Sequence, residues 1–317
     1  MTAADGRPEL SVVVALISGR PEDLERCLRA LADQREAPAL EVLVPYDEAA
    51  RGVAAVAERF PDVRFLPAPE LDTAAARAGA SREHHDTLRT LGLRAARGAA
   101  VALTEDHAVA SPGWAAALVR FLAAHPDVAA VGGAVECGAV DGGEPRLLNR
   151  AVHLCDFGRY QNPLSAGPAA YVSDSNVAYR TEALEAVRAA WADDYHETLV
   201  HAALTAAGHE LWLSPDPVVH QVRSSLRWRG ALRERFVWGR SFAGTRTREL
   251  SAARRAVYAA LSAALPLVLT WRVLQGARAR GRADGPFFAA LPLVLLLHGF
   301  WALGELAGYL TGDPGRA

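Results

Sequence analysis

Short apolar runs and amphipathic segments alternate through the first part of the chain. Leu10–Ile17 is a continuous apolar run, which is typical of a buried strand, and the segment Pro21–Leu31 carries apolar residues at helical spacing. The same pattern predicts strands at Glu41–Val44, Val63–Leu66, Ala100–Leu103 and Val128–Val135, and helices at Ala49–Phe60, Ser81–Arg97 and Pro112–His125. Because strands and helices alternate, we expect an α/β fold with a mainly parallel, Rossmann-like sheet covered on both faces.

In sheets of this type, ligands bind outside the carboxyl ends of the strands. That rule indicates three segments of this chain: Ser18–Arg20, Tyr46–Glu48 and Thr104–His107. The last segment contains the run Glu105-Asp106-His107, whose oxygen and nitrogen donors suit Mg²⁺ or Mn²⁺ bridging a diphosphate. An acidic run after a strand is also typical of a solvated turn, so the run alone leaves both interpretations open.

The character of the chain changes near residue 221. Gln221–Arg255 carries ten Arg and two Glu between apolar and aromatic residues, which predicts a basic, amphipathic helix. Two apolar stretches, Ala256–Trp271 and Pro286–Leu310, then predict a pair of helices. The first is about 24 Å long as a helix, short for a hydrocarbon core of about 30 Å, whereas the second is long enough to span.

We therefore expect three parts: a catalytic domain over residues 1–222, an Arg-rich linker over 223–255 and a membrane-associated helical hairpin over 256–317. Whether the hairpin spans the bilayer or lies in its surface stays open, because arginines flank the first apolar stretch at both ends. A hairpin buried in a soluble oligomer is the alternative.

Charge is divided unevenly along the chain. The net charge is −2, but residues 1–220 hold 19 Arg and 31 acids, and residues 221–317 hold 15 Arg and 5 acids. We expect anionic lipid as the partner of the basic part, and no nucleic acid, because no recognition module accompanies the arginines. Three cysteines at unrelated spacings and no signal-peptide pattern predict a reducing compartment, with the soluble part at the cytoplasmic face of the cell membrane.

Several weak motifs, in order, resemble the family 2 glycosyltransferases. The opening SVVVALISGRPEDLERCLRAL resembles the first strand and helix of that family, EVLVPYDE its second strand, and RTLGLRAARG a helix that follows. Pro112 and Trp114 stand at the spacing that follows the family's Asp-x-Asp signature. The resemblance spans Leu10–Arg240, and the ending FWALGELAGYLTG is similar to tails of bacterial members. It implies a GT-A nucleotide-diphospho-sugar transferase fold followed by hydrophobic C-terminal helices.

The resemblance also implies how a nucleotide-sugar donor binds. The implied donor contacts are Asp47, Arg89, Glu105 and Asp106. Glu105 and His107 take the positions of the two signature Asp residues, which implies a divalent metal, Mn²⁺ or Mg²⁺. The implied metal ligands are His107, Asp106 and His220, the last at the end of an expected strand, Pro217–His220, that follows a loop at Gly208–Pro215.

The acceptor and the catalytic base are implied by two further segments. SDSNVAYRTEAL resembles the acceptor-site segment, which implies acceptor contacts at Asn176 and Tyr179. YHETLVHAAL lies where the family places its catalytic carboxylate, so Glu197 is the candidate general base and Asp194 a nearby substitute. A zinc-protease helix is excluded here, because His196 and His201 are five positions apart rather than four.

These observations predict an inverting glycosyltransferase of the cell envelope. It would move a sugar from a nucleotide-sugar to a lipid-linked or cell-envelope glycan acceptor at the cytoplasmic membrane face. The alternative is a catalytically silent, GT-A-like, membrane-anchored binding or scaffold protein, which the changed signature at Glu105 and His107 favours. A dinucleotide-dependent dehydrogenase is excluded because no GxGxxG joins the first strand and helix. The sugar, the nucleotide and the oligomeric state are not indicated.

Overall fold

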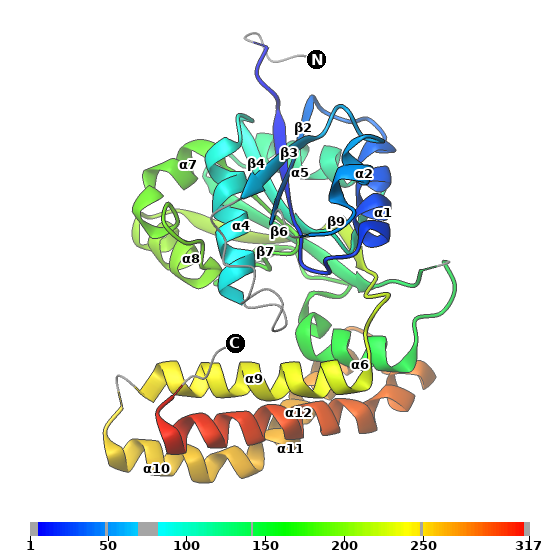
Figure 1. Ribbon diagram of the computed structural model, residues 1–317. Helices are drawn as coiled ribbons and strands as arrows, with labels where there is room; N and C mark the ends of the chain where they lie inside the picture. The colour runs from blue at the N-terminus through cyan, green and yellow to red at the C-terminus, as the bar shows by residue number, and fades with distance from the viewer. Residues whose placement is uncertain (1–5, 48–49, 69–81, 141, 248–249, 314–317) are drawn as a thin grey trace. The chain divides into compact units, whose positions relative to one another are not determined.

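The computed structural model describes residues 6–47, 50–68, 82–140, 142–247 and 250–313. The chain divides into two compact units (Figure 1). The first comprises Met1–Gly138 and Asn162–Val222, and the second comprises Ala139–Gln161 and Arg223–Ala317. The second unit therefore takes one segment from within the first, a division that no pattern in the sequence indicated.

One mixed sheet forms the centre of the first unit. Among the described residues it has nine strands: β1 (Leu10–Ala15), β2 (Leu40–Asp47), β3 (Arg64–Ala68), β4 (Ala100–Glu105), β5 (Ala108–Ala110), β6 (Val128–Cys137), β7 (Gly167–Pro168), β8 (Val177–Arg180) and β9 (Glu210–Gln221). Their order is β3-β2-β1-β4-β8-β6-β9-β5, and β7 pairs with β9. Strands β1, β2, β3, β4, β6 and β9 run in one direction, while β8 lies antiparallel between β4 and β6. The prediction of a mainly parallel α/β sheet is confirmed.

Helices cover both faces of this sheet (Figure 1). They are α1 (Pro21–Ala32), α2 (Val53–Ala57), α4 (Arg82–Ala95), α5 (Trp114–Ala124), α7 (Thr181–Ala186) and α8 (Glu197–Ala206). On one face, Leu93 of α4, Leu184 of α7 and Leu204 of α8 belong to the same buried cluster as the strand residues. On the other face, Phe121 of α5 packs against Trp212 of β9. Every residue of β1 and of β4 is buried, as a sheet covered on both faces requires.

Two of the expected elements differ in extent. The expected loop at Gly208–Pro215 is largely strand, because β9 pairs with β6 from Glu210 onward through two irregularities in register. At the second irregularity, between Gly132 and Ala134, Gly133 allows a close approach: a Cβ there would lie 2.0 Å from the carbonyl oxygen of Pro217. The helix expected at Ala49–Phe60 is shorter in the structure, where α2 spans only Val53–Ala57.

The second unit is helical. It contains α6 (Leu147–Asp156), α9 (Trp228–Arg246), α10 (Ala252–Leu261), α11 (Leu265–Ala279) and α12 (Gly285–Thr311). Leu148 of α6 is buried in one cluster with Ala277 of α11 and Leu297 of α12. Arg235 of α9 donates from Nη2 to both carboxylate oxygens of Asp156 at 2.5 Å. These contacts explain why the segment that carries α6 belongs to this unit.

Two segments of the second unit are long and apolar enough to cross a membrane. They are Ala252–Ala279 and Gly285–Thr311, with mean hydropathies of 1.6 and 1.9. Length and composition are weak evidence, since the core helix of a soluble protein passes the same test. Only 11% of the most apolar part of the first segment is buried, however, which is unlike a core helix.

Helices α9 and α12 meet through glycines. A Cβ on Gly304 would lie 2.0 Å from the carbonyl oxygen of Phe236, and one on Gly239 would lie 2.2 Å from that of Trp301. A Cβ on Gly308 would also be too close to the α9 backbone. The two backbones are therefore in direct contact, which only residues without side chains allow.

Candidate active site

The carboxyl ends of the parallel strands place acidic side chains at one edge of the sheet. Asp47 is the last residue of β2, and Glu105 is the last residue of β4, where it pairs in register with Ala15 at the end of β1. Both carboxylates are largely buried. The edge that the sequence indicated therefore carries two of the candidate donor residues.

Arg89 of α4 lies at the centre of this edge. Its Nη1 is 3.1 Å from Asp86 Oδ1, and its Nη2 is 3.3 Å from Glu105 Oε1 and 3.1 Å from Asp174 Oδ2. Burial alone would lower the pKa of this guanidinium, but the carboxylates raise it, so Arg89 is held in the charged form. With 3% of its surface exposed, Arg89 orients carboxylates rather than presenting itself to a donor. Its expected role as a direct donor contact stays a prediction.

Glu105 joins Arg89 to His107 and to a residue that the sequence did not indicate. Glu105 Oε2 accepts a hydrogen bond from Gln221 Nε2 at 2.9 Å and lies 3.4 Å from His107 Nε2. Burial raises the pKa of Glu105, while His107 and Arg89 act against that rise. Because neighbouring side chains of a strand point to opposite faces, Gln221 reaches Glu105 and His220 faces away. The structure therefore does not bring His220 to the predicted metal ligands.

Asp106 holds the loop between β1 and α1. Its Oδ2 accepts from the Ser18 hydroxyl at 2.6 Å, and its Oδ1 accepts from the backbone N–H groups of Ile17 and Ser18 at 3.1 and 3.0 Å. Burial opposes ionisation, yet contacts with His107 and Ser18 keep the pKa of Asp106 below its usual range. Asp106 is fully buried and its carboxylate accepts hydrogen bonds from the loop that follows β1, while its predicted donor and metal contacts stay predictions.

The candidate base lies at the start of α8 and is connected to the same network. Glu197 Oε2 accepts a hydrogen bond from the backbone N–H of Asp174 at 3.2 Å, and the Asp174 carboxylate pairs with Arg89. His196 bridges Asp86 and Asp194, with its two ring nitrogens 3.1 and 3.2 Å from their carboxylate oxygens. Polar contacts therefore run from Glu197 through Arg89 to Glu105, and Asp194 lies at one side of this network.

The two expected acceptor contacts lie in the core instead. Asn176 donates from Nδ2 to the carbonyl oxygens of Ala134 and Pro217 and accepts from Trp114 Nε1 at 2.8 Å. The Tyr179 hydroxyl is 2.8 Å from the Tyr195 hydroxyl. Both Asn176 and Tyr179 are fully buried, so they support the strands behind the site. The structure thus gives both residues a supporting role, and their contact with an acceptor stays a prediction.

A match to a family model identifies the family to which the chain belongs. The family model described as "Glycosyltransferase like family 2" matches residues 8–241. The chain belongs to this glycosyltransferase family. It is accordingly a nucleotide-sugar glycosyltransferase of the GT-A type, and the expected family, fold and enzyme class are confirmed.

Two solved structures match this glycosyltransferase at low sequence identity. One is the mannosyltransferase PcManGT from Pyrobaculum calidifontis in complex with GDP-Man and Mn²⁺, with 19% identity and a TM-score of 0.49, covering 96% of this chain and 86% of that chain. The other is TarS from S. aureus, with 15% identity and a TM-score of 0.44, covering 72% of this chain and 38% of that chain. No curated protein matches the chain.

Three polar residues of the glycosyltransferase site were not predicted from the sequence. Asp86 precedes Arg89 by one helical turn, a spacing at which opposite charges meet, so this signal was available. Asp174 lies within the SDSN segment, where the resemblance to an acceptor site indicated Asn176 instead. Gln221 carried no local signal, because its partner Glu105 is 116 positions away.

The side chains at the site determine how the divalent metal that the family implies could be held. Within the described residues, no group of three His, Cys, Asp or Glu side chains could hold a metal ion. Glu105 and His107 nevertheless offer a carboxylate oxygen and an imidazole nitrogen 3.4 Å apart. Metals that act on nucleotides are commonly held by one or two protein ligands together with substrate phosphates. The pair therefore fits a metal completed by a diphosphate, and does not fit an all-protein site.

Proposed function

We propose that this glycosyltransferase inverts the anomeric centre as it transfers a sugar to a lipid-linked or cell-envelope glycan acceptor at the cytoplasmic membrane face. The observation that supports this most directly is the polar network from Glu197 through Arg89 to Glu105. It links a half-buried carboxylate on one helix to the edge where the donor binds in sheets of this type. A catalytic base and a donor site are then held by one set of contacts.

Glu197 acts in this proposal as the general base. Its carboxylate accepts the proton of the acceptor hydroxyl while that oxygen attacks the anomeric carbon, and the nucleoside diphosphate leaves from the opposite side. A single displacement inverts the configuration. The backbone N–H of Asp174 orients Glu197 by holding Oε2. Arg89 is a positioning residue in this scheme, because it fixes Asp174 and Glu105 without reaching the solvent-facing side.

Asp47 is proposed to hold the nucleotide part of the donor. Replacing Asp47 with Asn should raise the Kd of the nucleotide-sugar about tenfold or more, since a hydrogen bond to a charged group contributes about 1.5–3 kcal/mol. The measurement is titration calorimetry with the nucleotide-sugar that most stabilises the protein. Asp62→Asn, an exposed acid of the same unit, is the matched control and should leave the Kd unchanged. Equal donor affinity in Asp47→Asn and the parent protein would remove the proposed contact.

Glu105 and His107 would hold the divalent metal. When bound, the metal would neutralise negative charge on the diphosphate of the donor. Because His107 offers an imidazole nitrogen, we expect Mn²⁺ to support transfer at least as well as Mg²⁺. Transfer rates are measured after removal of divalent ions and re-addition of each metal, for the parent protein and for His107→Ala. Full transfer in excess EDTA would exclude a metal role for this pair.

The second unit is proposed to hold the enzyme at the membrane. A shortened chain is a poor test, because α12 supplies buried residues such as Leu297 to the core of this unit. Substitution of exposed apolar residues is sharper: Leu267 and Trp271 of α11 are 68% and 55% exposed. The parent chain should stay with membranes through a high-salt wash and leave only with detergent.

The double variant Leu267→Gln, Trp271→Gln should be released by the salt wash, because burial of apolar side chains resists salt and headgroup attraction does not. The membrane-bound fraction is measured by sedimentation. Leu199→Gln replaces an equally exposed leucine of the first unit and should sediment as the parent does. A parent chain that stays in solution without detergent would contradict membrane attachment and weaken the case for a lipid-linked acceptor.

A further inference from the structure

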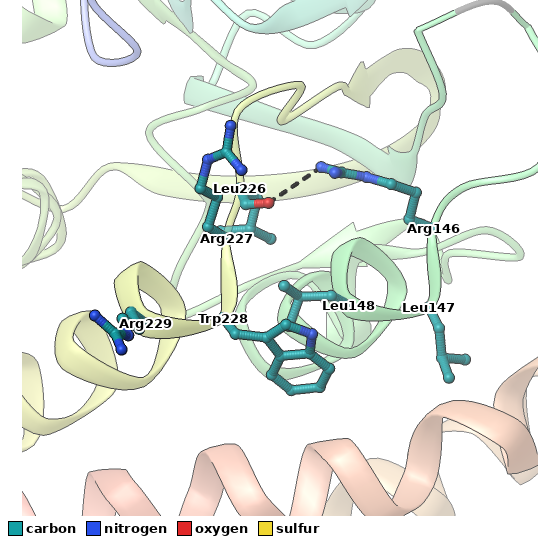
Figure 2. Close-up of a pocket in the computed structure, with 7 residues that line it drawn as sticks. All are labelled: Arg146, Leu147, Leu148, Leu226, Arg227, Trp228 and Arg229. Carbon is teal, nitrogen blue, oxygen red and sulfur yellow. Dashed lines mark hydrogen bonds between the residues drawn. The ribbon is translucent and has the colours of Figure 1, made fainter.

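The second unit contains a pocket that the transfer reaction does not use. Its volume is about 550 Å³, and it lies between the start of α6 and the segment that leads into α9 (Figure 2). Seven residues line it: Arg146, Leu147, Leu148, Leu226, Arg227, Trp228 and Arg229. Both apolar and cationic side chains therefore line this one cavity.

The apolar side of the pocket is partly open to solvent. Leu148 and Leu226 are buried, whereas Leu147 and Trp228 are 45% and 46% exposed. Figure 2 shows the Trp228 indole beside Leu148. The two exposed residues line the same pocket, and tryptophan is enriched where protein meets the interface of a membrane.

The cationic side carries charge that the protein does not neutralise. Arg146 reaches across the pocket and donates from Nη2 to the carbonyl oxygen of Leu226 at 3.3 Å (Figure 2), and the same nitrogen is 3.3 and 3.2 Å from the carbonyl oxygens of Arg223 and Ser224, so its contacts are to neutral groups. Arg227 and Arg229 make no side-chain hydrogen bond or ion pair within the part of the chain that the structure describes. The lining contains no carboxylate. An anion is therefore the complementary ligand, and guanidinium groups bind phosphate oxygens in pairs.

We propose that this pocket binds the phosphate head group of an anionic lipid. The phosphate lies between Arg146 and Arg227, Arg229 adds charge at the rim, and the first part of an acyl chain rests on Trp228 and Leu147. A free phosphate would leave the apolar side unused, whereas a lipid uses both sides. The same unit presents exposed apolar residues on α11, such as Leu267, which suit the surroundings of a lipid. This site lies in a different unit from the sugar-transfer site and is independent of it.

The proposal is tested on the full chain in non-ionic detergent. Three probes are titrated while the Tm is followed: dioctanoyl phosphatidic acid, dioctanoyl phosphatidylcholine and inorganic phosphate. A ligand that binds only the folded protein raises the Tm. Phosphatidic acid should raise it at concentrations at least about tenfold lower than either other probe does, because it alone joins an uncompensated phosphate charge to acyl chains. Equal effects of inorganic phosphate would show that the site takes any anion and would overturn the lipid assignment.

Variants locate the binding. Arg227→Gln with Arg229→Gln should weaken phosphatidic acid binding about tenfold, and Trp228→Ala should weaken it as well. Both changes lie at exposed positions, so the Tm without lipid should stay as in the parent. Arg254→Gln removes an exposed arginine on α10, beyond the opposite end of α9, and should bind as the parent does. An equal loss in Arg254→Gln would show diffuse attraction instead of a site. The affinity for the nucleotide-sugar should not change in any of these variants. A failure of the lipid proposal can therefore be told apart from a failure of the proposed sugar transfer.

Discussion

Replacing Arg89 with Ala should destabilise the first unit by about 3–5 kcal/mol, because breaking a buried ion pair leaves the partner charges buried and unneutralised. Asp86, Glu105 and Asp174 would all lose the same cation. The expected change is a fall in Tm of about 10 °C, measured by thermal unfolding in detergent. The large expected effect follows from the burial of Arg89 among three carboxylates, which the sequence did not indicate.

Arg94→Ala is the matched control for Arg89→Ala. It removes an arginine from the same helix, but the Arg94 side chain is 45% exposed and its nearest carboxylate, that of Asp193, is 3.8 Å away. Its effect on stability should stay within about 0.5 kcal/mol. Equal losses in the two variants would mean that α4, rather than the buried charge, sets the stability. Arg89→Lys should fall between parent and Arg89→Ala, because an ammonium keeps the charge but cannot bind three carboxylates in a fork.

Replacing Glu197 with Gln should lower the rate of sugar transfer by about 10²–10⁴-fold, the usual contribution of a positioned general base. Donor affinity should stay nearly unchanged, because the base acts on the acceptor hydroxyl. The amide keeps the size of the side chain and an oxygen for the N–H of Asp174, so the fold should be retained. The measurement is transfer from a nucleotide-sugar under single-turnover conditions, with donor binding measured separately.

Two neighbouring acids serve as controls for Glu197. Asp193 is fully exposed, so Asp193→Asn should transfer as the parent does. Asp194 pairs with His196, so Asp194→Asn should have a smaller effect than Glu197→Gln. A large loss in Asp194→Asn with none in Glu197→Gln would move the base to Asp194. If the parent binds donor but never transfers sugar, the scaffold interpretation replaces the catalytic one.

Local pattern was enough to predict the parallel half of the sheet. The apolar run at Leu10–Ile17 and the strands that end at Asp47 and Glu105 depend on neighbouring residues only, and their shared direction places their ends at one edge. Asp47 and Glu105 could therefore be placed from the sequence. Helix α6 could not be assigned to the second unit, because its contacts to Leu297 and Arg235 join segments about 80 or more positions apart.

The roles of individual side chains were harder to predict, because burial depends on pairing across the whole chain. Asn176 and Tyr179 belong to a segment similar to an acceptor site, but β8 inserts antiparallel between β4 and β6 and becomes a central strand. A central strand is covered on both faces, so these side chains bond to protein. Asp106 was predicted to contact the nucleotide-sugar for a similar reason. Its hydrogen bond from Ser18 joins residues 88 positions apart, and a local pattern does not show such a contact.

The glycine contact between α9 and α12 limits how deep either helix can lie in a bilayer. Gly304 and Gly308 hold the second half of α12 against the backbone of α9, so the two helices share one depth. Helix α9 carries five arginines, and each would cost about 2.5–3.5 kcal/mol at the centre of a bilayer on insertion scales. Arg235 of α9 lies close enough to His298, halfway along α12, to act on its charge, so a perpendicular α12 would carry Arg235 toward the hydrocarbon centre. The contact thus favours a helix pair that runs along the membrane plane, with the arginines level with the lipid phosphates.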